Sequence, residues 1–455
     1  MTVTRVLAPR TRLLLEAPVL PMLLRLSMPN VAEAVARVTF LTADALFVSW
    51  IGSDALAAVS IVFPLLLMFQ TATASGLGTG VSASIGSALG AADPDTARRL
   101  AGTAVALALI SSAAVTATFL VFGPALYLAM GATGRTLELA VNYGAVIFGG
   151  IGFVWLMNIL ANVARGSGNM RVPAFSIVGG EVMHLALSPM LILGWGPFPR
   201  RGIQGAAVGV LSAYALGAAT IGGYLCSRQA LARIQLVRVR ITAAETRTIL
   251  AIGAPAAATV LVFWAINVFT TGLIGQLGSG PIAAYGVAAR LDTIQYPLIF
   301  AFGSSVVTMV ATAIGAGDRS RAARIGRTGC AIAGVIALPF SGIAIFGQAW
   351  MSLFTGDLAI RATGALYLAC QAAVYPLFSA GIAAVWACYG ARVVKPPLIA
   401  SLIRFIVAVG GGWIALVLYE QALPVFVAVA AGGSVYGLAM LVILLKRLPT
   451  ATAPA

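Results

Sequence analysis

Charged residues are scarce in this chain: they make up 9% of its 455 residues, and only 13 of them are Asp or Glu. An ordinary soluble domain carries roughly 25% charged residues, so this scarcity excludes a soluble globular protein. Hydrophobic residues make up 60% instead. Apolar stretches of about 20 residues, the length that crosses a bilayer, recur from Leu24 to Leu445. The composition therefore indicates an all-α membrane protein.

Histidine occurs once, and HExxH, GxSxG, CxxC and P-loop motifs are all missing. A membrane-embedded enzyme needs convergent nucleophiles, acids, bases or metal ligands, so that class becomes a remote alternative. Without a P-loop, direct use of ATP is not expected. The four cysteines lie apart, which indicates neither a metal centre nor a disulfide framework. We expect no cofactor beyond a coupling ion, H⁺ or Na⁺.

The net charge of +15 does not indicate nucleic acid, because the basic residues lie in short loops between apolar stretches. With the N-terminus placed in the cytoplasm, 22 basic residues, Arg404 among them, fall in cytoplasmic segments. On the opposite side fall only Arg135, Arg200, Arg201 and Arg361. This bias predicts a multi-pass protein of the cell inner membrane with both termini in the cytoplasm.

Twelve apolar stretches are predicted to span the membrane, after an uncleaved, amphipathic opening segment. The predicted spans are 24–50, 56–88, 99–123, 137–164, 172–195, 203–227, 248–276, 282–314, 325–347, 361–389, 397–419 and 422–445.

An internal repeat relates the two halves of the chain. Ile85–Arg99 matches Val310–Arg324 at six identical positions, 225 residues further on, and Pro29 corresponds to Pro255. Six spans in each half give both halves the same orientation in the membrane, so the repeat is parallel. We predict two six-helix lobes related by a parallel pseudo-twofold repeat. Their bounds are 1–227 for the N-lobe, 228–247 for a cytoplasmic interlobe linker and 248–455 for the C-lobe.

Several segments carry a family resemblance. The first span holds LSMP at Leu26–Pro29 and then Asp44, and IGSDALAAVS follows at Ile51–Ser60. Glycine-bearing loops, RGSGNMRVP at Arg165–Pro173 and YGARVVKPP at Tyr389–Pro397, follow the fourth and tenth spans. Together with the span count and the duplication, they resemble the multidrug and toxin extrusion (MATE) family, and more loosely its DinF-like branch, over essentially the whole chain. The resemblance implies alternating-access export of amphipathic, often cationic, organic compounds in exchange for protons or sodium.

Ionisable side chains inside a bilayer are expensive, so each one is a candidate functional residue. Glu33, Arg37 and Asp44 share one face of the first span, and Glu33 and Arg37 are spaced to pair as a neutralised structural pair. Asp44 has no partner on its own helix. Because desolvation disfavours the charged form of an unpaired carboxyl, we expect it to exchange a proton near neutral pH. The resemblance implies the same role, since Asp44 falls where MATE transporters carry a first-helix acid; a hydrogen-bonded structural Asp44 is the alternative.

The fifth span places Glu181, His184 and Ser188 on one face at spacings of three and four. His184 is the only histidine, and a buried Glu and His one turn apart predict a proton relay beside Asp44, with interhelical packing as the alternative. Here the sequence departs from the family: DinF-like members often carry an Asn and an Asp at the positions of His184 and Ser188. The second acid is missing or has moved to Glu181.

The second half has fewer candidates. The seventh and tenth spans offer polar residues such as Asn267 where NorM-like sodium-coupled members keep acids, which disfavours a C-lobe sodium site. Arg290 and Asp292 begin the eighth span and point to different faces, so we interpret them as anchors of the outer end of that helix. Three aromatic residues are candidates to line an apolar substrate cavity, with helix packing as the alternative: Phe263, Trp264 and Tyr285.

The sequence thus predicts a cation-coupled antiporter for amphipathic or cationic organic compounds and drugs, and its lone acids favour protons over sodium. Its expected partners are small organic molecules and the bilayer, and we expect it to act as a monomer. A lipid-linked oligosaccharide or lipid flippase of the same superfamily is the alternative. Such flippases usually have additional spans and a more cationic cavity. A channel fits less well, because a twofold repeat with isolated buried acids is unlike a pore lined by rings.

Overall fold

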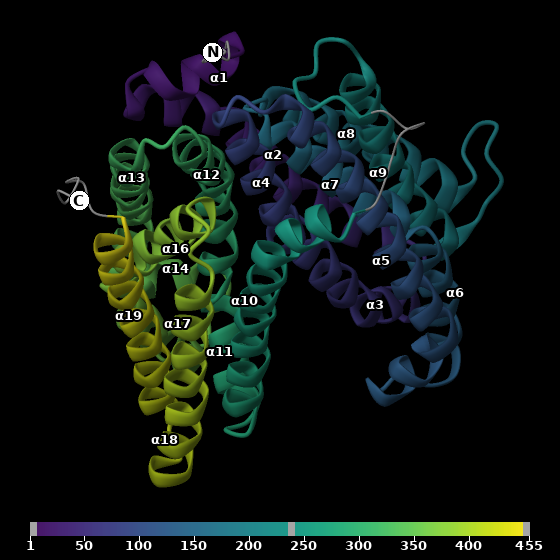
Figure 1. Cartoon of the computed structure of the whole chain (residues 1–455). Helices are drawn as coiled ribbons and strands as arrows, with labels where there is room; N and C mark the ends of the chain where they lie inside the picture. The colour runs from purple at the N-terminus through teal and green to yellow at the C-terminus, as the bar shows by residue number, and fades with distance from the viewer. Residues whose placement is uncertain (1–6, 235–241, 449–455) are drawn as a thin grey trace, which may run out of the picture. The chain divides into compact units, whose positions relative to one another are not determined.

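The computed structural model describes residues 7–234 and 242–448, and no β-strand occurs among them. The described chain is a succession of helices joined by short loops, shown in Figure 1. Residues 235–241 lie outside the described part, so the centre of the predicted linker, 228–247, is not placed.

The helices of the first half follow the predicted spans. They are α1 (Pro9–Glu16), α2 (Val19–Ser49), α3 (Ser53–Thr71), the π-helical turn η1 (Ala72–Leu77), α4 (Gly78–Gly90), α5 (Pro94–Ala129), α6 (Gly134–Gly149), α7 (Ile151–Gly166), α8 (Arg171–Leu193) and α9 (Gly202–Cys226).

The helices of the second half follow the other predicted spans. They are α10 (Ala243–Gly275), α11 (Ser279–Ala288), α12 (Arg290–Gly315), α13 (Arg319–Ile345), α14 (Gly347–Ser352), α15 (Leu358–Ala372), α16 (Val374–Gly390), α17 (Lys395–Phe405), the π-helical turn η3 (Ile406–Gly410), α18 (Gly411–Tyr419) and α19 (Ala422–Arg447). Compared with the first half, the short helix α14 is additional and the π-helical turn lies in a different span.

Within the described chain, nine helical segments are long and apolar enough to cross a membrane, or up to eleven if each bent pair is one span. The bent pairs are α6 with α7, at 42°, and α15 with α16, at 52°. Helix α2 falls outside that count, yet its 31 residues extend about 46 Å at 1.5 Å per residue, and it coincides with the first predicted span. The helices thus fit the predicted all-α, twelve-span, two-lobe fold.

The chain folds as two compact units. The first contains Met28–Ala254 with the described residues before Arg12, and the second contains Arg12–Ser27 and Pro255–Ala455. The chain passes between the units at three points, each inside a helix: after Thr11 in α1, after Ser27 in α2 and after Ala254 in α10. The second lies close to Pro29 and the third directly before Pro255. Proline removes a helical hydrogen bond and allows a kink, so the equivalent prolines mark two of the three places where the chain passes between units.

The repeat is visible in local contacts. Asp93 caps α5 by accepting a hydrogen bond from the Thr96 amide at 3.0 Å, and Asp318 caps α13 by accepting one from the Arg321 amide at 2.7 Å. The matching glycines also have the same role. A Cβ on Gly166 would lie 2.8 Å from the Ser82 carbonyl oxygen, and one on Gly390 would lie 2.8 Å from the Val307 carbonyl oxygen. Small residues at these positions let helices approach closely, as membrane helices must.

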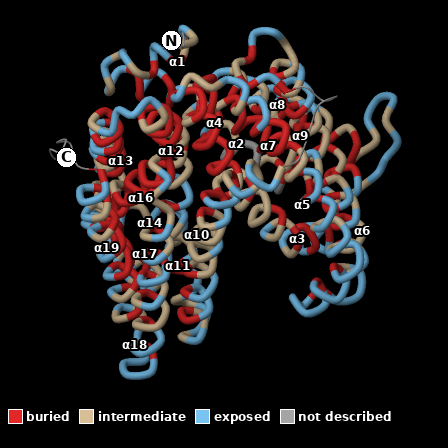
Figure 2. Tube along the Cα trace, viewed as in Figure 1, coloured by how far each residue is buried: buried red, intermediate tan, exposed pale blue. Residues whose placement is uncertain are grey.

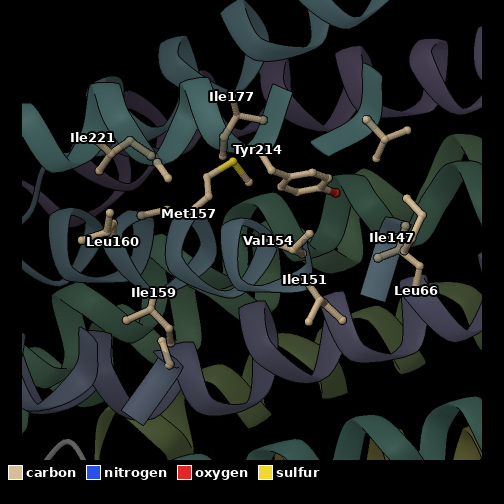
Figure 3. Packing of buried hydrophobic residues seen from close by; sticks show 14 of the residues in the cluster. Leu66, Ile147, Ile151, Val154, Met157, Ile159, Leu160, Ile177, Tyr214 and Ile221 are labelled. Carbon is tan, nitrogen blue, oxygen red and sulfur yellow. The ribbon is translucent and has the colours of Figure 1, made fainter. Parts of the chain in front are cut away.

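Each unit has its own apolar core. Figure 3 shows part of the first, where Met157 of α7 packs near Ile177 of α8 and Tyr214 of α9. Large apolar side chains such as Phe122 and Phe346 are exposed instead. Figure 2 colours exposed residues pale blue along the chain trace. Apolar exposure of this kind suits a surface solvated by lipid.

Candidate functional site

Three ionisable residues of the first unit meet where α2 and α8 pack together. His184 Nε2 of α8 lies 3.1 Å from Asp44 Oδ1 of α2, within hydrogen-bond distance, and both side chains are buried. His184 Nδ1 lies 3.8 Å from Glu181 Oε2. The imidazole therefore stands between two carboxyl groups, one at each ring nitrogen.

This geometry joins residues that the sequence indicated separately. The predicted members of the relay, Asp44, Glu181 and His184, lie together. The expectation that the Asp44 carboxyl is unpaired is wrong, because His184 from another helix bonds to it. The sequence placed the relay beside Asp44, but helical spacing alone could not predict a direct contact between residues 140 positions apart in the chain.

A second group of charges adjoins this cluster. Glu33 is buried and accepts from Arg37 Nε at 3.2 Å and from the Arg165 guanidinium at 2.7 Å. The predicted Glu33–Arg37 pair is thus confirmed, whereas the sequence assigns Arg165, at the end of α7, only to a cytoplasmic loop. Arg37 also interacts electrostatically with Glu181 and with Tyr214 of α9. These charged groups therefore form one continuous electrostatic network.

The network has a simple charge balance. Ionised Glu33, Glu181 and Asp44 contribute three negative charges, and Arg37 and Arg165 contribute two positive ones. With His184 neutral the sum is −1, so one proton, or one bound monovalent cation, makes it neutral. In a low-dielectric interior a net charge is far less stable than neutrality.

Ser188 lies one turn beyond His184 on α8, and its side chain is fully buried. Its hydroxyl has no hydrogen-bond partner among the described residues, and no hydrogen bond joins it to His184. Tyr143 of α6 interacts electrostatically with Asp44, and sequence spacing gave no sign of it.

The second unit contains a polar pocket around Asp292 of α12. The Tyr367 hydroxyl donates to Asp292 Oδ2 at 2.7 Å, and the Tyr375 hydroxyl donates to Oδ1 at 2.6 Å. The lining residues come from α10, α11, α12, α15, α16, α17 and α19: Ile266, Asn267, Thr270, Tyr285, Asp292, Tyr296, Tyr367, Gln371, Val374, Tyr375, Phe378, Arg404, Val429 and Gly433.

Arg404 of α17 is buried in this pocket. Its guanidinium carbon lies 4.3 Å from the ring centre of Phe378, 5.2 Å from that of Phe263 and 5.8 Å from that of Tyr436. The assignment of Arg404 to a cytoplasmic segment is wrong: it is buried inside the membrane-spanning stretch Lys395–Tyr419. The rule that selected Asp44, a charge within an apolar span, would have selected Arg404 too.

The remaining candidates divide between the pocket and the surface. Asn267 and Tyr285 line the pocket, whereas Phe263 contacts Arg404 and Trp264 is not among the lining residues. Arg290 and Asp292 do point to different faces. The Arg290 guanidinium lies over the ring of Phe354, 5.1 Å from its centre, and is exposed.

No group of three or more His, Cys, Asp or Glu side chains that could hold a metal ion occurs among the described residues. The two sites therefore differ in kind. The network of the first unit is rich in carboxyl groups, and the pocket of the second combines one carboxylate with tyrosine hydroxyls and a guanidinium.

Comparisons with known proteins agree with this fold. The MatE family model matches residues 29–190 and 255–414, one segment in each half. The chain is similar to a Shewanella oneidensis protein named FAD transporter, 30% identical with 76% of each chain covered. It is 27% identical to a Bacillus subtilis protein named Probable multidrug resistance protein YoeA, covering 73% of this chain and 72% of that one. The solved structure of a MOP superfamily transporter from Pyrococcus furiosus has the same fold, with TM-score 0.88, 24% identity and coverage of 97% and 98%.

Proposed function

Because this chain belongs to the MATE family of membrane transporters, we propose that it exports small organic compounds in exchange for protons, with Asp44 and His184 as the proton-binding pair. It is a transporter and not an enzyme. The observation that carries the proposal is the buried contact between His184 and Asp44, inside a network one negative charge from neutrality.

The proposed mechanism is competition for that charge. Histidine is the side chain that ordinarily titrates near physiological pH, and His184 is hydrogen-bonded to Asp44 at 3.1 Å. Glu181, at 3.8 Å from the other ring nitrogen, would have to move closer to exchange a proton with the ring. When the proton is bound, a second cation would leave the buried network with a net positive charge. When a cationic substrate binds, the proton leaves, and this exclusion makes the exchange obligatory.

Other groups interact electrostatically with these residues. Tyr143 of α6 interacts electrostatically with Asp44, while Tyr214 of α9 and Arg37 of α2 interact electrostatically with Glu181. Tyrosine and arginine ordinarily titrate far above neutral pH. They therefore keep their charge state during the exchange and set the electric field around Asp44, His184 and Glu181.

The names of the relatives give two substrate candidates. One relative is named for multidrug resistance and another for FAD, a dinucleotide with negatively charged phosphates. A cationic drug fits the negative network of the first unit. An anion would need a positive group, and buried Arg404 in the second unit is the observation that favours this second candidate.

We further propose that the protein acts as a monomer in the cell inner membrane with both termini in the cytoplasm. Lys446 and Arg447 at the end of α19 are consistent with a cytoplasmic C-terminus.

The test uses tetraphenylphosphonium, whose charge is independent of pH, in inside-out vesicles with wild-type protein. An imposed pH gradient alone should drive its uptake, and a sodium gradient alone should not. Uptake driven only by sodium would contradict proton coupling, and no uptake with either gradient would contradict cation export. Vesicles without the protein are the control.

A further inference from the structure

Arg404 is a buried charge that forms no hydrogen bond or ion pair with any described residue. Arg404 is 7% exposed and lies within the membrane-spanning stretch Lys395–Tyr419. Its Nε atom is buried and has no hydrogen-bond partner among the described residues. A buried ion whose hydrogen-bond donors meet no acceptor is unfavourable by several kcal/mol, so such a group points to a ligand that supplies one.

The surroundings of Arg404 define what that ligand must be. The rings of Phe378, Phe263 and Tyr436 contact the guanidinium from distances of 4.3 to 5.8 Å, a cation–π arrangement that holds its position and offers no hydrogen-bond acceptor. The guanidinium donors remain available to the pocket. Their planar fork matches the geometry of a carboxylate or a phosphate.

Asp292 lines the same pocket and interacts electrostatically with Arg404, but it forms no hydrogen bond or close ion pair with the guanidinium. Each of its oxygens accepts from a tyrosine hydroxyl, at 2.7 Å from Tyr367 and 2.6 Å from Tyr375, and no contact within 4.0 Å joins it to the arginine. Two hydroxyl donors stabilise the carboxylate where it stands. The positive charge of Arg404 therefore has no paired anion among the described residues.

The rest of the lining favours an aromatic body. Tyr285, Tyr296 and Phe378 line the pocket together with the two tyrosines that bind Asp292. The cavity is small, about 20 Å³, so it admits the anionic group, and a flat ring attached to that group would pack against the aromatic side chains at its edge. We propose that this pocket binds the anionic group of an aromatic organic substrate, with Arg404 as the residue that recognises the carboxylate or phosphate. The inference deepens the proposed export function and rests on it only for the fate of the bound compound.

The test is equilibrium binding to the purified full-length protein in detergent, measured by calorimetry, with a matched pair of probes. The probes are 2-naphthoate and its uncharged amide, 2-naphthamide. We expect wild-type protein to bind the anion more tightly. Arg404→Gln should weaken naphthoate binding by at least about tenfold while changing naphthamide binding far less, since one charge-assisted pair contributes about that much. Arg404→Lys, which keeps the charge, should restore part of the affinity.

The control is Arg319→Gln, which removes an exposed positive charge at the start of α13 and should leave naphthoate binding unchanged. Equal naphthoate affinity for wild type and Arg404→Gln, or no naphthoate binding by wild type, would overturn the proposal. An Arg404→Gln variant that loses affinity for both probes equally would indicate a structural role and overturn it too.

Two further comparisons complete the test: one distinguishes a lipid headgroup from a free organic anion, and the other distinguishes this proposal from that of proton-coupled export. Short-chain dihexanoyl phosphatidylglycerol should compete with naphthoate only weakly, and tighter competition by this lipid would assign the pocket to a headgroup instead. Because binding is measured without any gradient, it can fail while proton-driven uptake of tetraphenylphosphonium succeeds, and the reverse also holds.

Discussion

Replacing Asp44 with asparagine separates the charge of the carboxyl from its shape. In the wild type, His184 Nε2 lies 3.1 Å from Asp44 Oδ1. Asparagine has the same size as aspartate and can still hydrogen-bond to His184, but it can neither carry a negative charge nor give up a proton. Asp44→Asn should therefore insert normally and lose less than about 1 kcal/mol of stability, since one hydrogen bond is exchanged for another.

The expected loss of function follows from Coulomb's law. A cation about 4 Å from the carboxylate gains about 4 kcal/mol at an effective dielectric constant of about 20. Bound water screens part of this attraction, so we take the net contribution of the carboxylate as half of it, about 2 kcal/mol. Its loss in Asp44→Asn corresponds to about 30-fold weaker binding of tetraphenylphosphonium. Coupled uptake should be abolished, because the proton-bound and cation-bound states no longer exclude each other. Asp44→Glu, whose carboxyl is displaced by one methylene, should keep partial activity.

The assay is uptake into inside-out vesicles driven by a pH gradient, at matched abundance of wild type, Asp44→Asn and Asp44→Glu. Thermal unfolding of the purified variants controls for folding. Gradient-driven uptake by Asp44→Asn at the wild-type rate would refute the role of this carboxyl, and the proton would then have to be assigned to Glu181 or Glu33.

Three other predictions follow from the same contacts. His184→Ala should shift the pH dependence of uptake while leaving the protein folded, and an unchanged pH profile would reduce His184 to a packing residue. Glu33→Gln should destabilise the protein by about 3–5 kcal/mol, because two buried or half-buried arginines lose their carboxylate. Glu16→Gln is the control, because it removes the carboxylate of the exposed Arg12–Glu16 pair, and it should change stability by less than about 0.5 kcal/mol. Equal unfolding temperatures for Glu33→Gln and Glu16→Gln would show that the buried ion pairs of Glu33 contribute little. Single cysteines at Arg200 and Gln229 should be labelled from opposite sides of the membrane, and labelling from the same side would contradict the proposed orientation.

Much of the fold could be predicted because it depends on local patterns. The lengths of the apolar stretches gave the spans, and the repeat of Ile85–Arg99 in Val310–Arg324 gave the duplication, now visible in the matching caps of Asp93 and Asp318. The bends between α6 and α7 and between α15 and α16 were not predicted. They depend on how each helix packs against its neighbours, since a glycine or a proline near a bend permits it without determining its angle.

The candidate site was predictable only within single helices. Spacing along α2 gave the Glu33–Arg37 pair, and spacing along α8 gave Glu181 and His184. The contacts between helices, such as Arg165 with Glu33, depend on the rotation of each helix about its axis, which spacing within one helix does not determine. Arg404 was missed for another reason. It was included among the basic residues of the cytoplasmic segments, although it lies inside the predicted span 397–419.

Proton release on substrate binding tests the claim of competition most directly. Tetraphenylphosphonium is added to the purified protein in weakly buffered detergent solution near neutral pH, and the protons released are counted with a pH indicator. The charge balance of the network predicts about one proton released per bound cation for wild type and none for Asp44→Asn. Saturable binding of tetraphenylphosphonium to wild type without proton release would contradict the account.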